Sequence, residues 1–414
     1  MGYPPAVTTR EFEIVLWGAT GFTGRLVADY LATAPTAEGL RWAIAGRSES
    51  KLEAIKRELG LESLGLIVAN AYDPPSLKAM TARATVVCTT VGPYLEYGAD
   101  LVAACVENGT HYCDLTGEPP FIRNMIDAHH EAARDSNARI VHCCGFDSIP
   151  SDLGVLMMHE AMKERGLELR KVDAFFGESK GGFSGGTVAS LLGILDLAKE
   201  DRSILKVMGD PYGLDPRPRR GGPDGSDAKG IAYERRLRRW TAPFLMAPIN
   251  TRIVRRSNAV LEYPYGERFR YTERMSVGGG AKGMATAAAI AGGIGGFLVA
   301  SQVPAVRGWL EKKLPKAGEG PSASAREAGF FVVRLIAEAV TGETLMGRVS
   351  DDRDPGYGST KVMLGESALC LARDELSSAG GVLTPASAMG MSLLGRLREA
   401  GMTWTVTDNP ESGR

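Results

Sequence analysis

The feature that most constrains the fold is a short apolar run followed by a glycine-rich turn and an amphipathic segment. Glu13–Trp17 predicts a strand and Phe22–Ala34 a helix, with Gly-Ala-Thr-Gly-Phe-Thr-Gly at 18–24 between them. In this order one glycine permits a tight turn, another lets the backbone approach a phosphate, and a third allows close packing of helix on strand. The helix N-terminus then attracts an anion. The pattern predicts a dinucleotide-binding unit whose cofactor contacts are Gly18, Ala19, Thr20, Gly21, Phe22, Thr23 and Gly24.

Similar units repeat about six times over the first 150 residues. Strands are predicted at 42–45, 66–69, 84–91, 111–115 and 139–144, and helices at 50–59, 75–82, 101–107 and 120–134. Such alternation predicts an α/β fold of the Rossmann type, a doubly wound parallel sheet with right-handed crossovers. We therefore assign residues 1–150 to an NAD(P)-binding domain.

The pattern changes after residue 150. Strands are predicted at 171–176, 251–260, 269–277 and 402–407, a hairpin at 330–336 and 345–349, helices at 188–199, 361–373 and 387–398, and an irregular stretch at 210–239. This less regular order predicts a second, α+β domain over 151–414 for substrate binding or dimerisation. A final strand or helix is expected to pack back on the first domain.

The residues after the second strand favour NADP(H) over NAD(H). An NAD site usually offers a carboxylate to the ribose 2′-hydroxyl, whereas this chain has Arg47 and Ser48, with Lys51 one turn later. An arginine there binds a 2′-phosphate through two hydrogen bonds. Glu49 is the competing feature, and Arg47 as a plain surface charge stays an alternative.

Residues after the third and fourth strands complete the predicted cofactor site. Asp73 follows the third strand, where an acid often contacts adenine. Thr90, Val91, Gly92 and Pro93 follow the fourth and are expected near the nicotinamide, because ligands bind beyond the carboxyl ends of the strands.

Bulk properties exclude several classes of protein. The formal net charge is −1, which does not indicate a nucleic-acid partner. The six cysteines form no CxxC pair and no zinc spacing, so we predict no metal site. No basic start followed by an apolar run precedes residue 20, so a cytoplasmic protein is expected.

Several motifs together resemble a known family. They are 18–24, Ala45-Gly46-Arg47-Ser48, Val91-Gly92-Pro93-Tyr94, 114–118, 144–152, 180–187, Met246-Ala247-Pro248, Asp354-Pro355-Gly356-Tyr357 and 381–386. Over nearly its whole length the chain resembles the saccharopine dehydrogenase-like oxidoreductases, and within them the mycobacterial trans-acting enoyl reductases. The resemblance implies reduction by NADPH of a carbon–carbon double bond in an acyl or polyketide chain carried by a synthase, with a product used in complex lipid (glycolipid) biosynthesis. Two alternatives stay open, an imine or amino-acid reductase and a non-enzymatic, membrane- or lipid-associated dinucleotide-binding protein.

Enoyl reduction needs a group that polarises the thioester carbonyl and a proton for the α-carbon. We predict Tyr94 as the polar donor, because it follows Gly92-Pro93, although a tyrosine packed at the domain seam fits equally. Asp114, Thr116 and Glu118 follow the fifth strand and Asp147 and Ser148 the sixth. Asp147 is the second predicted catalytic residue, while helix capping is the plainer role for Ser148.

Residues 284–300 form an apolar stretch without a charge. It is short for a membrane span, which takes about 20 residues, and it is rich in alanine and glycine. A buried helix, the lining of an acyl tunnel, and contact with a lipid surface through 284–316 all stay open. In the last case the protein would lie peripherally on the plasma membrane. The basic run 235–239 fits an acidic carrier, an anionic lipid or a solvated loop. A homodimer also stays open.

Overall fold

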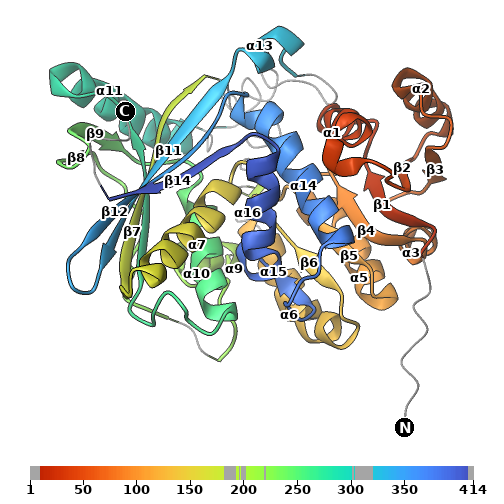
Figure 1. Ribbon diagram of the computed structural model, residues 1–414, viewed down its shortest axis with the longest axis horizontal. Helices are drawn as coiled ribbons and strands as arrows, with labels where there is room; N and C mark the ends of the chain where they lie inside the picture. The colour runs from red at the N-terminus through yellow and green to blue at the C-terminus, as the bar shows by residue number, and fades with distance from the viewer. Residues whose placement is uncertain are drawn as a thin grey trace.

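The computed structural model describes residues 10–180, 193–194, 196, 202–218, 221–300, 303 and 320–408. These residues form two seven-stranded sheets with a layer of helices between them (Figure 1). The first sheet is parallel and the second is mixed, as expected for a Rossmann-type fold joined to an α+β part. The predicted fold class is confirmed.

The first sheet has the strand order β13-β6-β5-β4-β1-β2-β3. Its strands are β1 (Phe12–Trp17), β2 (Trp42–Gly46), β3 (Gly65–Val68), β4 (Ala84–Thr89), β5 (His111–Cys113), β6 (Arg139–Val141) and β13 (Gly381–Leu383). The chain runs outward from β1 to β3 and then restarts at β4 on the other side of β1. The carboxyl ends of β1 and β4 therefore flank the crevice in which doubly wound folds bind ligands.

Helices connect these strands and cover both faces of the sheet. They are α1 (Phe22–Thr33), α2 (Glu49–Leu59), α3 (Pro74–Ala82), α4 (Tyr94–Tyr97), α5 (Ala99–Asn108) and α6 (Pro119–Asp135), with a 3-10 turn η1 (Pro35–Ala37) after α1. Ser48 caps α2, and Gly60 ends it in the left-handed conformation at φ +67°. Prolines occupy the first turn of α3 and of α6, where their missing N–H costs nothing.

The second sheet has the strand order β14-β12-β11-β7-β10-β9-β8. Its strands are β7 (Leu169–Lys180), β8 (Ala232–Glu234), β9 (Arg239–Ala242), β10 (Arg270–Ser276), β11 (Phe330–Ala339), β12 (Thr344–Asp351) and β14 (Thr403–Thr407). The pair β7–β10 is parallel and the others are antiparallel. The predicted hairpin is confirmed as β11–β12, which turns at Gly342 with φ +103°.

The helices of the middle layer come mostly from the C-terminal half. They are α7 (Ile149–Glu164), α10 (Ala247–Val260), α14 (Thr360–Arg373), α15 (Pro385–Ala388) and α16 (Gly390–Glu399). Helix α14 packs on β1, β4 and β5, and β13 pairs with β6, so late segments complete the first sheet. The final strand β14 instead pairs with β12 in the second sheet. The division into domains 1–150 and 151–414 stays a prediction.

The strand predicted for 251–260 is wrong, because these residues belong to helix α10. The β-branched Thr251, Ile253 and Val254 favour a strand locally. Polar and apolar residues of α10 are buried alike, including the arginines Arg252 and Arg256, which are each 1% exposed. A helix that is buried on all sides has no polar face, so the sequence does not show the helical spacing of apolar and polar residues.

Three smaller expectations also differ from the structure. Gly390, with φ +51°, divides the helix predicted for 387–398 into α15 and α16. The irregular stretch predicted for 210–239 begins directly after α9 (Ser203–Gly209). Its last part forms β8 and the start of β9. The helix predicted for 188–199 lies mostly outside the described residues.

The apolar stretch 284–300 lies in α11 (Gly280–Ala300), at the margin of the molecule beside β8 and β9 (Figure 1). The helix packs against β9 and is otherwise largely exposed, with Val299 72% and Met284 43% accessible. The buried-helix interpretation is therefore wrong. Among the described residues, we find no helix whose length and apolar character suffice to cross a bilayer.

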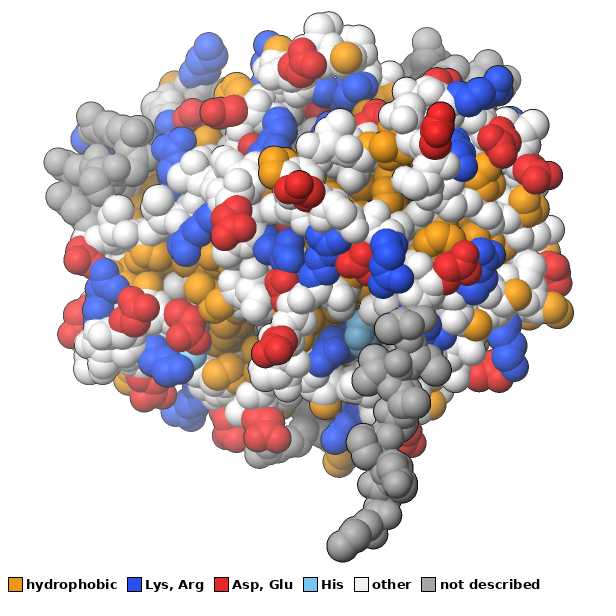
Figure 2. Space-filling view, turned by 45° about the vertical axis from the view of Figure 1, so that its right-hand side comes forward, with side chains coloured by type: hydrophobic (Ala, Val, Ile, Leu, Met, Phe, Trp, Pro, Cys, Tyr) orange, Lys and Arg blue, Asp and Glu red, His pale blue; other side chains and the backbone are white. Residues whose placement is uncertain are grey.

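Basic and acidic side chains are interspersed over the face that Figure 2 shows, and no large region of this face carries charges of one sign alone. This distribution agrees with the formal net charge of −1. Nucleic-acid-binding surfaces gather lysine and arginine on one face, and the face in Figure 2 does not.

Candidate functional site

The glycine turn at the end of β1 forms a tight cradle. Gly18 has φ +93°, and a Cβ there would lie 2.6 Å from Cγ2 of Val91. A Cβ on Gly24 would lie 2.1 Å from the Gly18 carbonyl oxygen, so helix α1 passes as close to the turn as a glycine allows. Gly21 caps α1 without any side-chain hydrogen bond. The helix start is thus left for an external acceptor, which suits a pyrophosphate.

The end of β2 adds a positive charge beside this turn. Arg47 is exposed and has no ion pair among the described residues. Ser48 accepts a 3.4 Å hydrogen bond from the Lys51 N–H as the cap of α2. Thr20 lies against Gly46, since a Cβ there would be 3.7 Å from its Cγ2. An exposed arginine next to the turn fits the 2′-phosphate of NADP(H).

The end of β4 is tied to the same turn. The Thr90 hydroxyl donates a 3.3 Å hydrogen bond to the Gly18 carbonyl, and the Val91 N–H donates to Thr89 Oγ1 at 3.2 Å. The Gly92–Pro93 peptide bond is cis. The structure thus brings the residues predicted after β1, β2 and β4 to one edge of the sheet. Asp73 precedes α3 at the edge strand β3, two strands from the turn, and its carboxylate makes no capping bond.

Tyr94 lies at this edge, but its hydroxyl is turned into the protein. Its side chain is 6% exposed; the hydroxyl donates to the Thr89 carbonyl at 3.3 Å and accepts from the Leu115 N–H at 3.2 Å. Burial raises the pKa of Tyr94 well above its usual value. The Glu118 carboxylate accepts the Tyr94 N–H at 3.1 Å and so fixes the start of α4. Tyr94 therefore joins β4 to β5, and its catalytic role stays a prediction.

Asp114 follows β5 and connects several buried groups of the site through hydrogen bonds. Its carboxylate accepts hydrogen bonds from the Tyr112 hydroxyl at 2.8 Å and from Nδ1 of His142 at 2.7 Å. It also accepts the N–H groups of Thr116 and Cys143, each at 3.1 Å. Both Asp114 and His142 are fully buried, and His142 Nε2 has no partner in the part of the chain that the structure describes. The pair sets the loops after β5 and β6 relative to each other.

Asp147, in the turn between β6 and α7, is half-buried. Among the described residues, no group donates a hydrogen bond to its carboxylate, and burial raises its pKa to about 6. A carboxyl of this kind holds a proton more readily than an exposed one and gives it up near neutral pH. Asp147 is therefore equipped to act as a general acid.

A buried network of hydrogen bonds begins at Ser148, the residue after Asp147. The Ser148 hydroxyl donates to Asn250 Oδ1 at 2.9 Å, so it does not cap α7 as the sequence suggested. Asn250 Nδ2 donates to the Glu273 carboxylate at 3.0 Å, and the hydroxyls of Ser151 and Tyr271 donate to it at 2.5 and 2.7 Å. Burial raises the pKa of Glu273 to about 7. No pattern in the sequence indicates Asn250 or Glu273, because their contacts depend on α10 being a helix.

Aromatic rings line the second sheet next to the Asp147 turn. Phe146 contacts Phe331 edge-to-face at 4.6 Å and Phe176 at 6.1 Å, and Phe176 stacks on Phe244 at 4.1 Å between ring centres. Phe146 is half-buried and thus reaches the surface of this group. We call Phe146, Phe176, Phe244 and Phe331 the phenylalanine wall. Such a wall suits an apolar ligand beside the cofactor edge.

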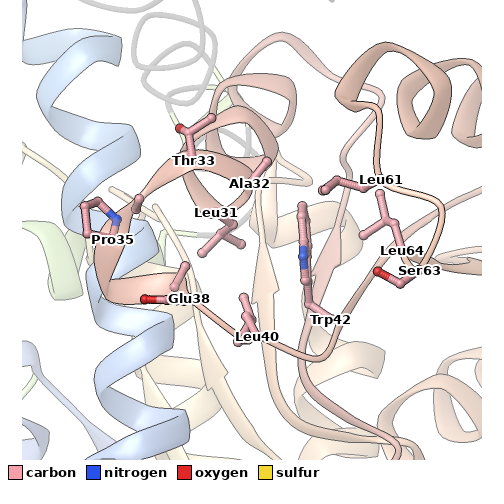
Figure 3. A pocket seen from close by; sticks show the side chains of 13 residues that line it. Leu31, Ala32, Thr33, Pro35, Glu38, Leu40, Trp42, Leu61, Ser63 and Leu64 are labelled. Atoms are coloured by element: carbon pink, nitrogen blue, oxygen red, sulfur yellow. The ribbon is translucent and has the colours of Figure 1, made fainter.

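A pocket of about 460 Å³ lies elsewhere, at the start of β2 (Figure 3). Its lining includes Leu31 at the end of α1, Trp42 at the start of β2, and Leu61 and Leu64 after α2. The glycine turn and Arg47 lie at the opposite, carboxyl ends of the strands. This pocket is therefore separate from the candidate cofactor site. No three His, Cys, Asp or Glu side chains of the described residues are grouped as a metal ion would require.

Comparison with known proteins agrees with this geometry. Residues 14–141 match the saccharopine dehydrogenase NADP binding domain. A Mycobacterium tuberculosis protein with the provisional name trans-acting enoyl reductase is 48% identical over 97% of this chain and 98% of its own length. The trans-acting enoyl reductase of Mycobacterium ulcerans is 45% identical over 96% of this chain and 98% of its own. Apo saccharopine dehydrogenase from Saccharomyces cerevisiae shares the fold, with a TM-score of 0.52 and 12% identity over 95% of this chain and 99% of that chain. The predicted cofactor, NADP(H), is confirmed.

Proposed function

Because this chain belongs to the family of the trans-acting enoyl reductases and is an NADP-dependent oxidoreductase, we propose that it reduces a carbon–carbon double bond in an acyl or polyketide chain. A separate synthase delivers the acyl or polyketide substrate, and the reduced product enters complex lipid (glycolipid) assembly. The observation that carries the proposal is Asp147, a half-buried carboxyl with a pKa raised to about 6 at the cofactor edge of the sheet.

The residues of the site support distinct parts of this reaction. NADPH, when bound, supplies the hydride to the β-carbon. Asp147 holds the proton that the α-carbon receives, since burial keeps its carboxyl protonated to about pH 6. Gly18–Gly24 and Arg47 hold the two phosphate-bearing parts of the cofactor. The polarising donor is the role that we assign to Tyr94, which requires its hydroxyl to exchange the Thr89 carbonyl for the substrate.

The phenylalanine wall supports an acyl substrate. Its rings lie beside the Asp147 turn, and the half-buried Phe146, backed by the three buried rings, offers apolar contact to a hydrocarbon chain. An amino-acid substrate with several carboxylates needs a group of cations instead. Among the described residues near the turn, Arg252, Arg255 and Arg256 of α10 are buried and engaged with Asp227, Asp224 and backbone carbonyls. This arrangement favours enoyl reduction over saccharopine-like imine chemistry.

The test is NADPH consumption by the purified protein with two substrate panels. One panel contains 2-enoyl thioesters of increasing length, free and attached to an acyl carrier protein, and the other pairs 2-oxo acids with amino acids. Turnover of the enoyl panel, rising with chain length, supports the proposal. Turnover of the second panel alone overturns it in favour of an imine reductase. Binding of NADPH without turnover of either panel favours a non-enzymatic role.

A second part of the proposal is contact with an anionic lipid surface through α11. This helix carries no charge after Lys282 and is exposed on most sides, so a flat protein partner would leave apolar surface uncovered whereas a lipid layer would not. The turn of the β8–β9 hairpin lies against its start, because a Cβ on Gly279 would be 3.2 Å from the Arg238 carbonyl oxygen. In this proposal the protein works in the cytoplasm and meets the plasma membrane from that side.

The hairpin has the composition of a membrane interface. Arg235 and Arg238 are exposed and without an ion pair among the described residues, while Tyr233 is 46% and Ile231 38% exposed. Cations at the level of the lipid headgroups and aromatic rings below them stabilise such contacts. Co-sedimentation with phosphatidylglycerol vesicles, lost in Arg235→Glu/Arg238→Glu and kept in the control Arg165→Glu, supports the contact. Equal sedimentation of both variants, or binding to neutral vesicles alone, contradicts it. A homodimer through α11 would instead appear as a doubled mass without lipid.

A further inference from the structure

Phe22, the first residue of α1 and part of the glycine turn 18–24, is covered by residues from far along the chain. The Arg326 guanidinium carbon lies 5.4 Å from the centre of the Phe22 ring. The Tyr357 ring meets Phe22 edge-on at 4.9 Å between centres, with an angle of 83°. A Cβ on Gly320 would lie 2.2 Å from a Phe22 ring atom. Three positions between 320 and 357 therefore enclose one side of the cofactor turn.

Hydrogen bonds hold this covering segment in place. Helix α13 (Ala323–Glu327) is capped by Ser322, whose hydroxyl oxygen accepts the Ala325 N–H at 3.3 Å. The Asp354 N–H donates to the Arg326 carbonyl at 3.0 Å. The Asp354 carboxylate in turn accepts the Tyr357 N–H at 3.1 Å, at the start of η2 (Pro355–Ser359). The same aspartate therefore positions both the ring and the backbone that bracket Phe22.

The Arg326 side chain is only partly used by these contacts. One terminal nitrogen donates to the Pro321 carbonyl at 2.6 Å, and no carboxylate pairs with the guanidinium among the described residues. Arginine presents five N–H donors, so several stay available. The half-buried Lys361 lies nearby; burial lowers its pKa, and the charge of Arg326 acts in the same direction. Arg326 and Lys361 thus place two positive charges next to the positive end of α1, and the carboxylates of Asp29 and Glu327 offset part of the charge around Lys361.

We propose that Arg326 binds the pyrophosphate of NADP(H) and that α13 closes the cofactor site from the C-terminal half of the chain. The guanidinium stacks on Phe22 through its face and directs its free N–H groups along the glycine turn, where the phosphates contact the α1 amides. The Asp354-Pro355-Gly356-Tyr357 motif then acts as the anchor of this closure. The inference adds Arg326 to the residues of the cofactor site and does not depend on the proposed substrate.

The test measures binding rather than turnover. NADPH, 2′-phospho-ADP-ribose and adenosine 2′-monophosphate are titrated against the wild type, Arg326→Ala, Arg326→Lys and the control Arg165→Ala. The first two ligands contain the pyrophosphate, and the third contains only the 2′-phosphate. We expect Arg326→Ala to raise the Kd of the first two about tenfold and Arg326→Lys to raise it less, because a charged hydrogen-bond pair is lost or weakened. The Kd of adenosine 2′-monophosphate should stay unchanged.

Two results would overturn the proposal. An unchanged Kd for NADPH in Arg326→Ala excludes a phosphate contact. A similar rise in the Kd of all three ligands, adenosine 2′-monophosphate included, moves Arg326 to the 2′-phosphate end of the cofactor. Arg326→Gln, which keeps most of the side-chain bulk over Phe22, separates loss of charge from loss of packing: it should behave as Arg326→Ala does. Since no enoyl substrate is present, failure here is distinct from failure of the proposed reaction.

Discussion

The Leu115 N–H donates a 3.2 Å hydrogen bond to the hydroxyl of Tyr94, which joins the end of β5 to the end of β4 at the cofactor edge. The same hydroxyl donates to the Thr89 carbonyl at 3.3 Å. Tyr94 was the residue that the sequence favoured as the polar donor, and its geometry allows two distinct outcomes on substitution.

Tyr94→Phe removes both of these hydrogen bonds and leaves the Leu115 N–H and the Thr89 carbonyl without them. We expect the free energy of unfolding to fall by about 1–2 kcal/mol, measured by urea denaturation. If the hydroxyl only joins the strands, kcat changes by less than about fivefold. A fall in kcat of about 100-fold, measured under conditions where the variant is folded, would instead establish the hydroxyl as a catalytic group.

Asp147→Asn should abolish the pH dependence that its carboxyl imposes. The pKa of Asp147 is raised to about 6, and a general acid acts while protonated, so kcat/KM of the wild type should fall as the pH rises above 6. The variant should lose about 100-fold in kcat and show no fall in that range. Asp352→Asn, at an exposed position, serves as the control. An unaltered pH profile in Asp147→Asn would remove Asp147 from the proton transfer.

Arg47→Ala should separate the two nicotinamide cofactors. Loss of the exposed guanidinium at the end of β2 removes the predicted contact with the 2′-phosphate. We expect the Kd of NADPH to rise about tenfold or more and the Kd of NADH to stay within about twofold, as measured by fluorescence titration. Arg57→Ala, exposed on the adjoining helix α2, is the matched control. Equal weakening of both cofactors would assign Arg47 to another part of the site.

Glu273→Gln should change how stability depends on pH. Burial raises the folded-state pKa of Glu273 from its usual 4.5 to about 7, so the folded protein holds this proton more tightly than the unfolded chain. Stability therefore falls as the pH rises from about 4.5 through 7. The variant cannot ionise there, so from pH 5 to pH 8 its stability relative to the wild type should improve by about 1–3 kcal/mol. A constant difference between the two proteins would contradict a raised pKa.

The local parts of the fold could be predicted, and the long-range parts could not. The glycine turn and the uncharged β4 are defined by residues that are neighbours in sequence, so turn chemistry and period suffice for them. Strand β13 has three residues and pairs with β6, which lies 242 positions earlier in the chain, so no local pattern records the pairing. The contact of Phe22 with Tyr357 is of the same kind.

The residues of the candidate site also divide into those that local sequence patterns predict and those that depend on long-range contacts. Arg47 and the residues after β4 were found because the carboxyl ends of parallel strands meet at one edge. Asp147 was placed at that edge, but its raised pKa follows from burial that only the folded chain has. Asn250 and Glu273 were missed because α10, buried on all sides, resembled a strand.

The most direct test of the central claim follows the hydrogen atoms. The purified protein is incubated with a carrier-bound 2-enoyl thioester and NADPH that carries deuterium at the transferable position, and the product is analysed by mass spectrometry and NMR. The account predicts a saturated thioester with one deuterium at the β-carbon and one solvent-derived hydrogen at the α-carbon, formed in proportion to the NADPH consumed. An unreduced thioester in the presence of tightly bound NADPH would contradict it.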